Sequence, residues 1–276
     1  MMTRPIPSTG EAMPVIGLGT WRAFDVGSGE TGRRPLRGVL QQLLDEGGRI
    51  IDTSPMYGRA EAVTGDLLAE MGRRPPSFLA TKVWTTGRER GIEQMRRSAQ
   101  LLRTEVIDLI QIHNLVDWRT HLAMLRRMKE EGRVRYIGIT HYTAGALPEL
   151  ARILRTEPGI DFVQLGYSVA ARAAETELLP TALDRGVAVI ANQPLARGDL
   201  LRGVRGRPLP EWAHEFDCAS WSQLFLKYIL AEPALTCVIP ATGNPEHMTE
   251  NLAAGSGGLP DARQRRKISE LWDALG

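Results

Sequence analysis

The 276-residue sequence predicts an eight-stranded α/β barrel, because eight short apolar runs recur along it and segments with helical signals lie between them. Most runs are nearly continuous rather than alternating, as expected for parallel strands buried on both faces. A doubly wound sheet is the alternative. The expected strands are Val15–Gly19, Arg49–Thr53, Ser77–Trp84, Val106–Asn114, Tyr136–Thr140, Phe162–Tyr167, Val187–Ala191 and Cys237–Pro240.

The segments between the runs have the apolar spacing and the glycine ends of helices. They cover Leu36–Asp45, Glu61–Met71, Ile92–Leu102, His121–Glu131, Ala144–Thr156, Glu177–Arg185, Trp221–Leu230 and Glu246–Ala254. Before the first strand, turn signals at Ser8–Gly10 predict an N-terminal hairpin over the barrel bottom, and Asp261–Leu275 predicts an extra C-terminal helix. The widest gap, Pro194–Ala219, predicts a functional or mobile loop.

Composition and charge exclude several classes of function. The 34 basic and 32 acidic residues leave a net charge of +2 without segregation, so nothing points to nucleic acid or a membrane surface. Cys218 and Cys237 do not make a disulfide framework or, with the histidines, a metal site by spacing. The first residues lack a signal-peptide run, and no segment approaches the roughly 20 apolar residues of a membrane span. We expect a cytoplasmic monomer with one domain over residues 1–276.

Polar residues interrupt three consecutive apolar runs at their carboxyl ends. Asp52 ends RIID, Lys82 lies near the end of SFLATK and His113 ends LIQIH, while Tyr57 follows in the connection after Asp52. In a barrel these strands are neighbours, and active sites of the fold form at this end. The four side chains are therefore expected to converge at one mouth.

Each of these residues also has a purely structural interpretation. Asp52 fits a turn, Tyr57 a rim aromatic and His113 a satisfied core histidine. Lys82 is harder to explain in this way, because a lysine in a buried strand needs an acidic partner or a lowered pKa. Asp52 on the adjacent strand is the expected partner.

The combination is suited to carbonyl reduction. A lysine ammonium beside a tyrosine stabilises the phenolate and lowers the tyrosine pKa, which eases proton donation by Tyr57. Asp52 would hold Lys82 in place, and a neutral His113 would polarise the carbonyl. Gly17-Leu18-Gly19 lacks the third glycine of a dinucleotide fingerprint and adds little.

These residues lie within segments that resemble the aldo-keto reductase family over nearly the whole chain. The segments are Met13–Trp21 (MPVIGLGTW), Gly48–Gly58 (GRIIDTSPMYG), Phe78–Trp84, Ile107–His113, Tyr136–Tyr142, Val163–Tyr167, Gln193–Gly198 and Ile239–Asn251 (IPATGNPEHMTEN). The resemblance implies NAD(P)H-dependent reduction of an aldehyde or ketone, with Asp52, Tyr57, Lys82 and His113 as the catalytic tetrad. It also implies that Trp21 and Trp84 line the substrate pocket.

The resemblance further implies where the cofactor binds. Thr140, His141, Gln164 and Asn192 would contact the nicotinamide, Pro194, Leu195, Arg197 and Gly198 the pyrophosphate, and Thr242, His247, Glu250 and Asn251 the adenosine phosphate end. Two positions depart from the family pattern, which often has a stacking tyrosine where this chain has Asn192 and a basic residue where it has Ala241. In the helix that follows, His247 replaces a further Arg of the pattern. Arg197, Arg202 or Arg205 would compensate for the missing basic residue at position 241. NADPH is the expected cofactor, with NADH possible.

Two other functions fit parts of the pattern. A cofactor-binding sensor or regulatory subunit with little turnover would account for the changed cofactor positions. A barrel lyase or hydrolase built on Asp52 and Lys82 would leave Tyr57 and His113 unexplained. The intact tetrad favours the reductase.

Overall fold

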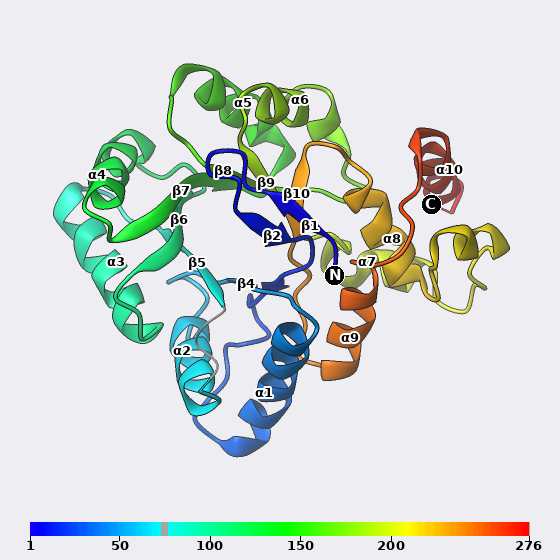
Figure 1. Ribbon diagram of the computed structural model, residues 1–276, viewed down its shortest axis with the longest axis horizontal. Helices are drawn as coiled ribbons and strands as arrows, with labels where there is room; N and C mark the ends of the chain where they lie inside the picture. The colour runs from blue at the N-terminus through cyan, green and yellow to red at the C-terminus, as the bar shows by residue number, and fades with distance from the viewer. Residues whose placement is uncertain (73–76, 276) are drawn as a thin grey trace.

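The computed structural model describes residues 1–72 and 77–275 and shows the expected (β/α)8 barrel (Figure 1). Each strand pairs in parallel with the next strand along the chain, and bridges from Ile16 to Val238 and from Gly19 to Ala241 bring the first strand against the last. The barrel strands are β3 (Leu18–Gly19), β4 (Ile50–Asp52), β5 (Phe78–Val83), β6 (Ile107–His113), β7 (Val134–His141), β8 (Phe162–Gly166), β9 (Ala188–Asn192) and β10 (Leu235–Val238).

Helices surround the strands in the order of the chain (Figure 1). They are α1 (Glu30–Asp45), α2 (Ala60–Glu70), α3 (Arg88–Leu101), α4 (Trp118–Glu130), α5 (Leu147–Thr156), α6 (Leu178–Asp184), α8 (Trp221–Leu230) and α9 (Pro245–Ala253), with short turns η1 (Ala144–Ala146) and η2 (Ala173–Glu175). The extra helix α10 (Ala262–Asp273) packs against α8, where the Phe225 and Trp272 rings meet at 5.7 Å. Among residues 1–72 and 77–275, none of the helices has the length and apolar content of a membrane span.

The N-terminal hairpin covers one end of the barrel, as predicted. Strands β1 (Thr3–Pro5) and β2 (Ala12–Pro14) pair antiparallel and lie over the barrel centre in Figure 1. Ile6 and Met13 are fully buried in the apolar cluster inside the barrel. The Tyr136 hydroxyl donates to Glu11 Oε2 at 2.7 Å, which fixes the hairpin to β7. The opposite end, where the strands end, is left to form a site.

Two expectations about the elements need correction. Only Leu18–Gly19 of the expected strand Val15–Gly19 is strand, because the residues before it make only an isolated bridge, from Ile16 to Val238. The chain also packs closely on β4 there: a Cβ at Gly17 would lie 1.8 Å from Ile50 Cγ2. The expected loop Pro194–Ala219 is largely helical. It contains η3 (Ala196–Gly198), α7 (Asp199–Gly203) and η4 (Glu211–Phe216).

Buried side chains explain why this long connection forms short helices instead of an extended loop. Leu200 and Phe216 are buried, so the short helices dock on the core instead of extending into solvent. The buried Lys227 ammonium on α8 donates to the Phe216 carbonyl, and to the carbonyls of Ser256 at 2.8 Å and Gly258 at 3.0 Å. It thereby ties η4 to the segment between α9 and α10.

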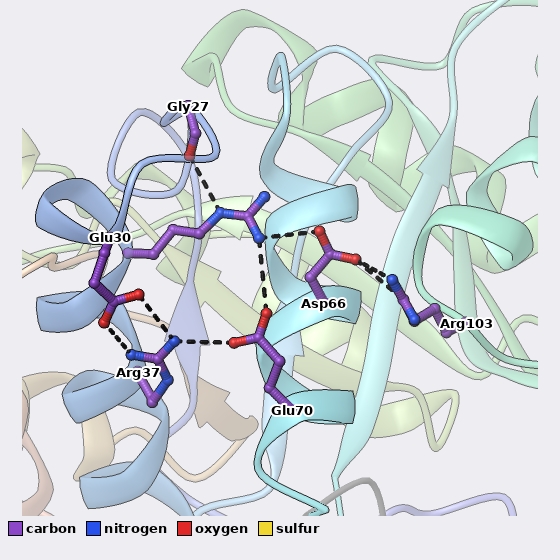
Figure 2. A network of polar contacts seen from close by, with 7 residues as sticks. Gly27, Glu30, Arg37, Asp66, Glu70 and Arg103 are labelled. Atoms are coloured by element: carbon purple, nitrogen blue, oxygen red, sulfur yellow. Dashed lines mark hydrogen bonds and ion pairs between the residues drawn. The ribbon is translucent and has the colours of Figure 1, made fainter.

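Ion pairs cross the outer faces of α1 and α2 and reach the end of α3 (Figure 2). Arg33 Nε also donates to the Gly27 carbonyl at 3.2 Å. Gly27 lies in the connection after β3, so this contact fixes that connection to the helices. The paired side chains are Arg33, Arg37, Arg103, Glu30, Asp66 and Glu70.

Candidate active site

The strand register brings the predicted tetrad to one end of the barrel. Asp52 ends β4, Lys82 is the penultimate residue of β5 and His113 ends β6, and these strands are neighbours in the sheet. Tyr57 lies in the connection that leaves β4, where its backbone N–H donates to the Ser54 carbonyl at 3.0 Å. Residues that are far apart in the sequence thus surround one point at the open end.

Asp52 and Lys82 form a buried ion pair. The distance between Lys82 Nζ and Asp52 Oδ2 is 2.6 Å, and Nζ also donates to the Thr53 carbonyl at 2.7 Å. Burial by itself lowers the pKa of Lys82, but the Asp52 carboxylate and then Tyr57 outweigh it, so the pKa is raised. Lys82 therefore stays charged inside the barrel.

Tyr57 lies against both Lys82 and His113. Lys82 Nζ is 5.1 Å from the centre of the Tyr57 ring, and the Tyr57 and His113 rings meet edge to face at 6.0 Å. Burial raises the pKa of Tyr57, and the charge of Lys82 offsets only part of that effect. The expected lowering of this pKa by Lys82 is present, but desolvation of the phenol is the larger effect.

His113 is held as a neutral imidazole. Its Nδ1 lies 3.2 Å from the Ser54 hydroxyl, which leaves Nε2 for the cavity that His113 lines. Burial lowers the pKa of His113 to about 3, and the positive charge of Lys82 adds to the effect. A neutral ring at this position donates a hydrogen bond without carrying charge.

Two glutamines hold the second oxygen of Asp52. Gln111 Nε2 donates to Asp52 Oδ1 at 3.1 Å, and Gln164 Nε2 donates to the same atom at 2.9 Å. Gln164 was predicted to contact the cofactor. Neither Gln111 nor Ser54 was among the predicted site residues. The available signal for Gln111 was an amide inside the otherwise apolar run LIQIH.

A cavity of about 660 Å³ opens above these residues. Asp52, Tyr57, His113 and Trp21 line it, together with every predicted cofactor residue except His141: Thr140, Gln164, Asn192, Pro194, Leu195, Arg197, Gly198, Thr242, His247, Glu250 and Asn251. Lys82 is fully buried and lies behind the lining. The predicted residues therefore share one continuous cavity, with three exceptions.

Besides Lys82, the residues outside the lining are His141 and Trp84. His141 stacks on Tyr142 at 5.7 Å, and its Nδ1 accepts from the Thr143 N–H at 3.2 Å. Trp84 is 42% exposed, its ring lies 6.5 Å from that of His113, and Gln94 bonds its backbone N–H and carbonyl. Both residues thus border the site without lining this cavity, and their contacts with cofactor and substrate stay predictions.

Known proteins resemble the chain in sequence and in fold. It is 29% identical to the aldo-keto reductase YhdN of Bacillus subtilis, over 77% of this chain and 66% of that one. The methylglyoxal reductase YeaE of Escherichia coli is 26% identical over 92% and 89%. An aldo-keto reductase structure from Klebsiella pneumoniae with NADPH superposes with a TM-score of 0.80, 25% identity and coverage of 99% and 96%.

Residues 15–273 match the Aldo/keto reductase family. The chain belongs to this family. Its relatives are oxidoreductases that act on carbonyl groups, and the family resemblance noted in the sequence is confirmed. The match spans all eight barrel strands of this aldo-keto reductase.

Asn192, one of the two departures from the family pattern, extends the polar network of this reductase. Asn192 Nδ2 donates to Gln164 Oε1 at 3.1 Å, and Gln164 in turn donates to Asp52. Asn192 Oδ1 is buried and has no partner within the described part of the chain. The position of a stacking ring is therefore taken by an amide with one free acceptor.

The cavity end near α9 is built from capping residues. Asn244 Oδ1 accepts from the Glu246 N–H at 2.9 Å, and Thr242 Oγ1 accepts from the Asn244 N–H at 3.0 Å. Asn251 Oδ1 accepts from the Ser222 hydroxyl at 3.3 Å. Ala241, the second departure, is exposed and lines the cavity. This end of the reductase thus has ordered polar groups but no cation at position 241.

Proposed function

We propose that this aldo-keto reductase reduces an aldehyde or ketone to an alcohol with NADPH, and that Tyr57 is the general acid. The observation that carries the proposal is the convergence of Tyr57, His113 and the Asp52–Lys82 pair at the floor of one cavity. When bound, the reduced nicotinamide supplies a hydride to the carbonyl carbon. The carbonyl oxygen then takes the proton of Tyr57.

Burial favours the neutral phenol of Tyr57, and the charge of Lys82 stabilises its phenolate. Because burial raises its pKa, Tyr57 is a neutral phenol at physiological pH and holds the proton that the alkoxide needs. When the proton leaves, the phenolate lies beside the charged Lys82, which stabilises it. Asp52 keeps that lysine in position and balances its charge. Solvent returns a proton to Tyr57 after the alcohol departs.

His113 orients and polarises the substrate. With Nδ1 toward Ser54, a hydrogen on Nε2 points to where the carbonyl oxygen lies beside Tyr57. The very low pKa of His113 keeps it neutral, so it polarises the carbonyl without competing with Tyr57 as the proton donor.

The residues of the cavity fit a nicotinamide dinucleotide. Thr140, Gln164 and Asn192 contribute hydroxyl and amide groups to the cavity lining. The free acceptor Asn192 Oδ1 suits a carboxamide NH₂. Pro194–Gly198 and the Thr242–Asn251 end would take the phosphates and the adenosine. The NADPH complex of the Klebsiella relative supports the choice of NADPH. Another Escherichia coli relative, 25% identical, is an NADH-specific methylglyoxal reductase, and Ala241 leaves NADH possible here.

Two measurements test the proposal. Titration of NADPH and NADH against tryptophan fluorescence gives both affinities, and we expect NADPH to bind more tightly. A panel of aldehydes and ketones that includes methylglyoxal, with NADPH oxidation as the readout, should then show turnover. Tight cofactor binding without turnover of any aldehyde or ketone in the panel would contradict the proposed reduction. It would favour a cofactor-binding sensor.

A further inference from the structure

Ser54 contacts both groups that meet the carbonyl oxygen in the proposed reduction. Its hydroxyl Oγ lies 3.2 Å from His113 Nδ1, and its carbonyl accepts from the Tyr57 N–H at 3.0 Å. Ser54 itself is fully buried and does not line the cavity. Any effect of Ser54 on a bound substrate therefore passes through His113 or Tyr57.

The local sequence explains how one residue reaches both. Residues 54–57 form a turn that is closed by the bond from the Tyr57 N–H to the Ser54 carbonyl. Serine in the first position and proline, here Pro55, in the second are both favoured in such turns. The Met56 N–H also donates to Ser54 Oγ at 3.4 Å, which holds the hydroxyl against the turn. The sequence Ser-Pro-Met-Tyr thus fixes the Ser54 hydroxyl relative to Tyr57.

The hydrogen bond between Ser54 and His113 can form in two directions. A hydroxyl has one hydrogen, and a neutral imidazole has one N–H and one bare nitrogen. His113 is neutral because burial lowers its pKa to about 3. In the first direction the Ser54 hydroxyl donates to a bare Nδ1, and the ring hydrogen lies on Nε2. In the second, Nδ1–H donates to Ser54 Oγ and Nε2 is bare.

Hydrogen bonding and burial favour the first direction. With the hydroxyl donating to Nδ1, Ser54 Oγ still accepts from Met56, so the hydroxyl hydrogen and oxygen both have partners. In the second direction the hydroxyl hydrogen has no acceptor among the described residues, and solvent does not reach it because Ser54 is 0% exposed. A buried donor without an acceptor is costly. The second direction would also turn the lone pair of a bare Nε2 toward the substrate oxygen, where two acceptors repel.

The aromatic neighbours of His113 do not distinguish the two directions. The Tyr57 ring meets the imidazole edge to face at 6.0 Å, and the Trp84 ring lies 6.5 Å from it. These contacts hold the plane of the imidazole, but they are the same whichever nitrogen carries the hydrogen. Within the described part of the chain, the Ser54 hydroxyl is the one group that bonds a ring nitrogen of His113. The tautomer is therefore set at Ser54.

We propose that Ser54 is a positioning residue of carbonyl reduction: its hydroxyl donates to His113 Nδ1 and thereby fixes the tautomer whose Nε2–H donates to the substrate carbonyl. The inference rests on the proposed reduction and adds to it the residue that directs His113. Because a hydrogen bond at Nδ1 also restricts rotation of the ring, Ser54 keeps Nε2–H aimed at the oxygen that takes the Tyr57 proton.

The ring nitrogens of His113 report the tautomer directly and without turnover. In the unmodified enzyme labelled with ¹⁵N-histidine, at neutral pH, Nε2 should have the chemical shift of a protonated nitrogen and Nδ1 that of a bare, hydrogen-bonded nitrogen. The His113→Gln variant assigns these signals among the five histidines. In Ser54→Ala the Nδ1 resonance should move toward that of a bare nitrogen without a hydrogen bond. A protonated Nδ1 in the unmodified enzyme would overturn the inference, as would an unchanged Nδ1 resonance in Ser54→Ala.

Kinetics test whether Ser54 acts through His113. With NADPH oxidation as the readout and the aldehyde of the panel that is reduced fastest, Ser54→Ala should lower kcat about fivefold to tenfold, as for the loss of one hydrogen bond. KM for NADPH should not change. In a His113→Gln background the same substitution should have almost no further effect, because its target is gone. An equal fold loss in both backgrounds would overturn the inference, since Ser54 would then act through the turn to Tyr57 or through the fold.

Thr64→Val is the matched control. Thr64 Oγ1 is buried on α2 and has no partner among the described residues, so this variant also removes one buried hydroxyl. It should leave kcat and the His113 resonances unchanged. Absence of turnover by the unmodified enzyme would count against the proposed reduction, whereas the His113 resonances would still decide whether Ser54 sets the tautomer.

Discussion

Lys82 Nζ lies 2.6 Å from Asp52 Oδ2, and both side chains are almost completely buried. The remaining carboxylate oxygen, Oδ1, accepts from two amide groups, those of Gln111 and Gln164. A buried ion pair is stable when its other hydrogen-bonding positions are filled. The pair therefore supplies a fixed positive charge beside Tyr57.

Removing one charge of the Asp52–Lys82 pair should lower the free energy of unfolding more than removing both. Lys82→Met leaves the Asp52 carboxylate buried without its partner, and we expect a loss of about 3–5 kcal/mol in the free energy of unfolding. Asp52→Asn combined with Lys82→Met should recover about 2 kcal/mol of this loss in stability. Carbonyl reduction should stay lost in the double variant. Urea denaturation of the single and double variants measures the coupling. Strictly additive losses would show that the pair is not coupled.

The neutral His113 predicts a dependence of stability on pH. Its pKa falls from 6.5 to about 3 on folding, so the unfolded chain binds the proton first as the pH falls. The contribution of the neutral ring is complete above pH 6.5 and is lost below it, at up to about 1.4 kcal/mol per pH unit. In His113→Gln, the free energy of unfolding should fall less steeply between pH 6 and pH 4. Equal slopes in the two proteins would refute the lowered pKa.

Gln111 is expected to act on catalysis through Asp52. Gln111→Leu removes one hydrogen bond to the carboxylate and should lower kcat about tenfold, the equivalent of about 1.4 kcal/mol. KM for NADPH should not change. Stability should change little, because Gln111 Oε1 is buried without a partner in the described structure and leucine suits the apolar strand. An unchanged kcat would assign Gln111 to packing alone.

Gly58 supports the connection that carries Tyr57. It has φ +60°, and a Cβ there would lie 2.4 Å from the Asp25 carboxylate, which accepts from the Arg59 N–H at 3.0 Å. Gly58→Ala should lower kcat and cost about 2 kcal/mol in unfolding free energy, from backbone strain and displacement of Asp25. Gly10→Ala is the control for strain alone, because Gly10 has φ +76° and open space around it. It should cost about 1 kcal/mol and leave kcat unchanged. Equal effects of Gly58→Ala and Gly10→Ala on kcat would show that Gly58 does not support Tyr57.

Much of this architecture was predictable because buried parallel strands impose apolar runs on the sequence. The ends of those runs showed where Asp52, Lys82 and His113 would meet, since neighbouring strands of a barrel end on one face. The order in η4 was not predictable, because it depends on Lys227 reaching carbonyls from two distant segments.

The finer features of the site depend on three-dimensional contacts. Gln111 pairs in register with Lys82, and only that register brings its amide to Asp52. The direction of the Tyr57 pKa shift depends on how deeply the phenol is buried, which the sequence does not record. Arg197 reaches the Trp21 ring only once β3 and β9 are in place.

Tyr57 is expected to donate the proton while taking little part in cofactor binding. The direct test is Tyr57→Phe, assayed for NADPH affinity by fluorescence titration and for aldehyde reduction by NADPH oxidation. We expect affinity within about twofold of the unmodified enzyme and a loss in kcat of roughly a thousandfold, typical of a removed general acid. A Tyr57→Phe variant that binds NADPH and reduces aldehydes at the original rate would show that Tyr57 is not the general acid.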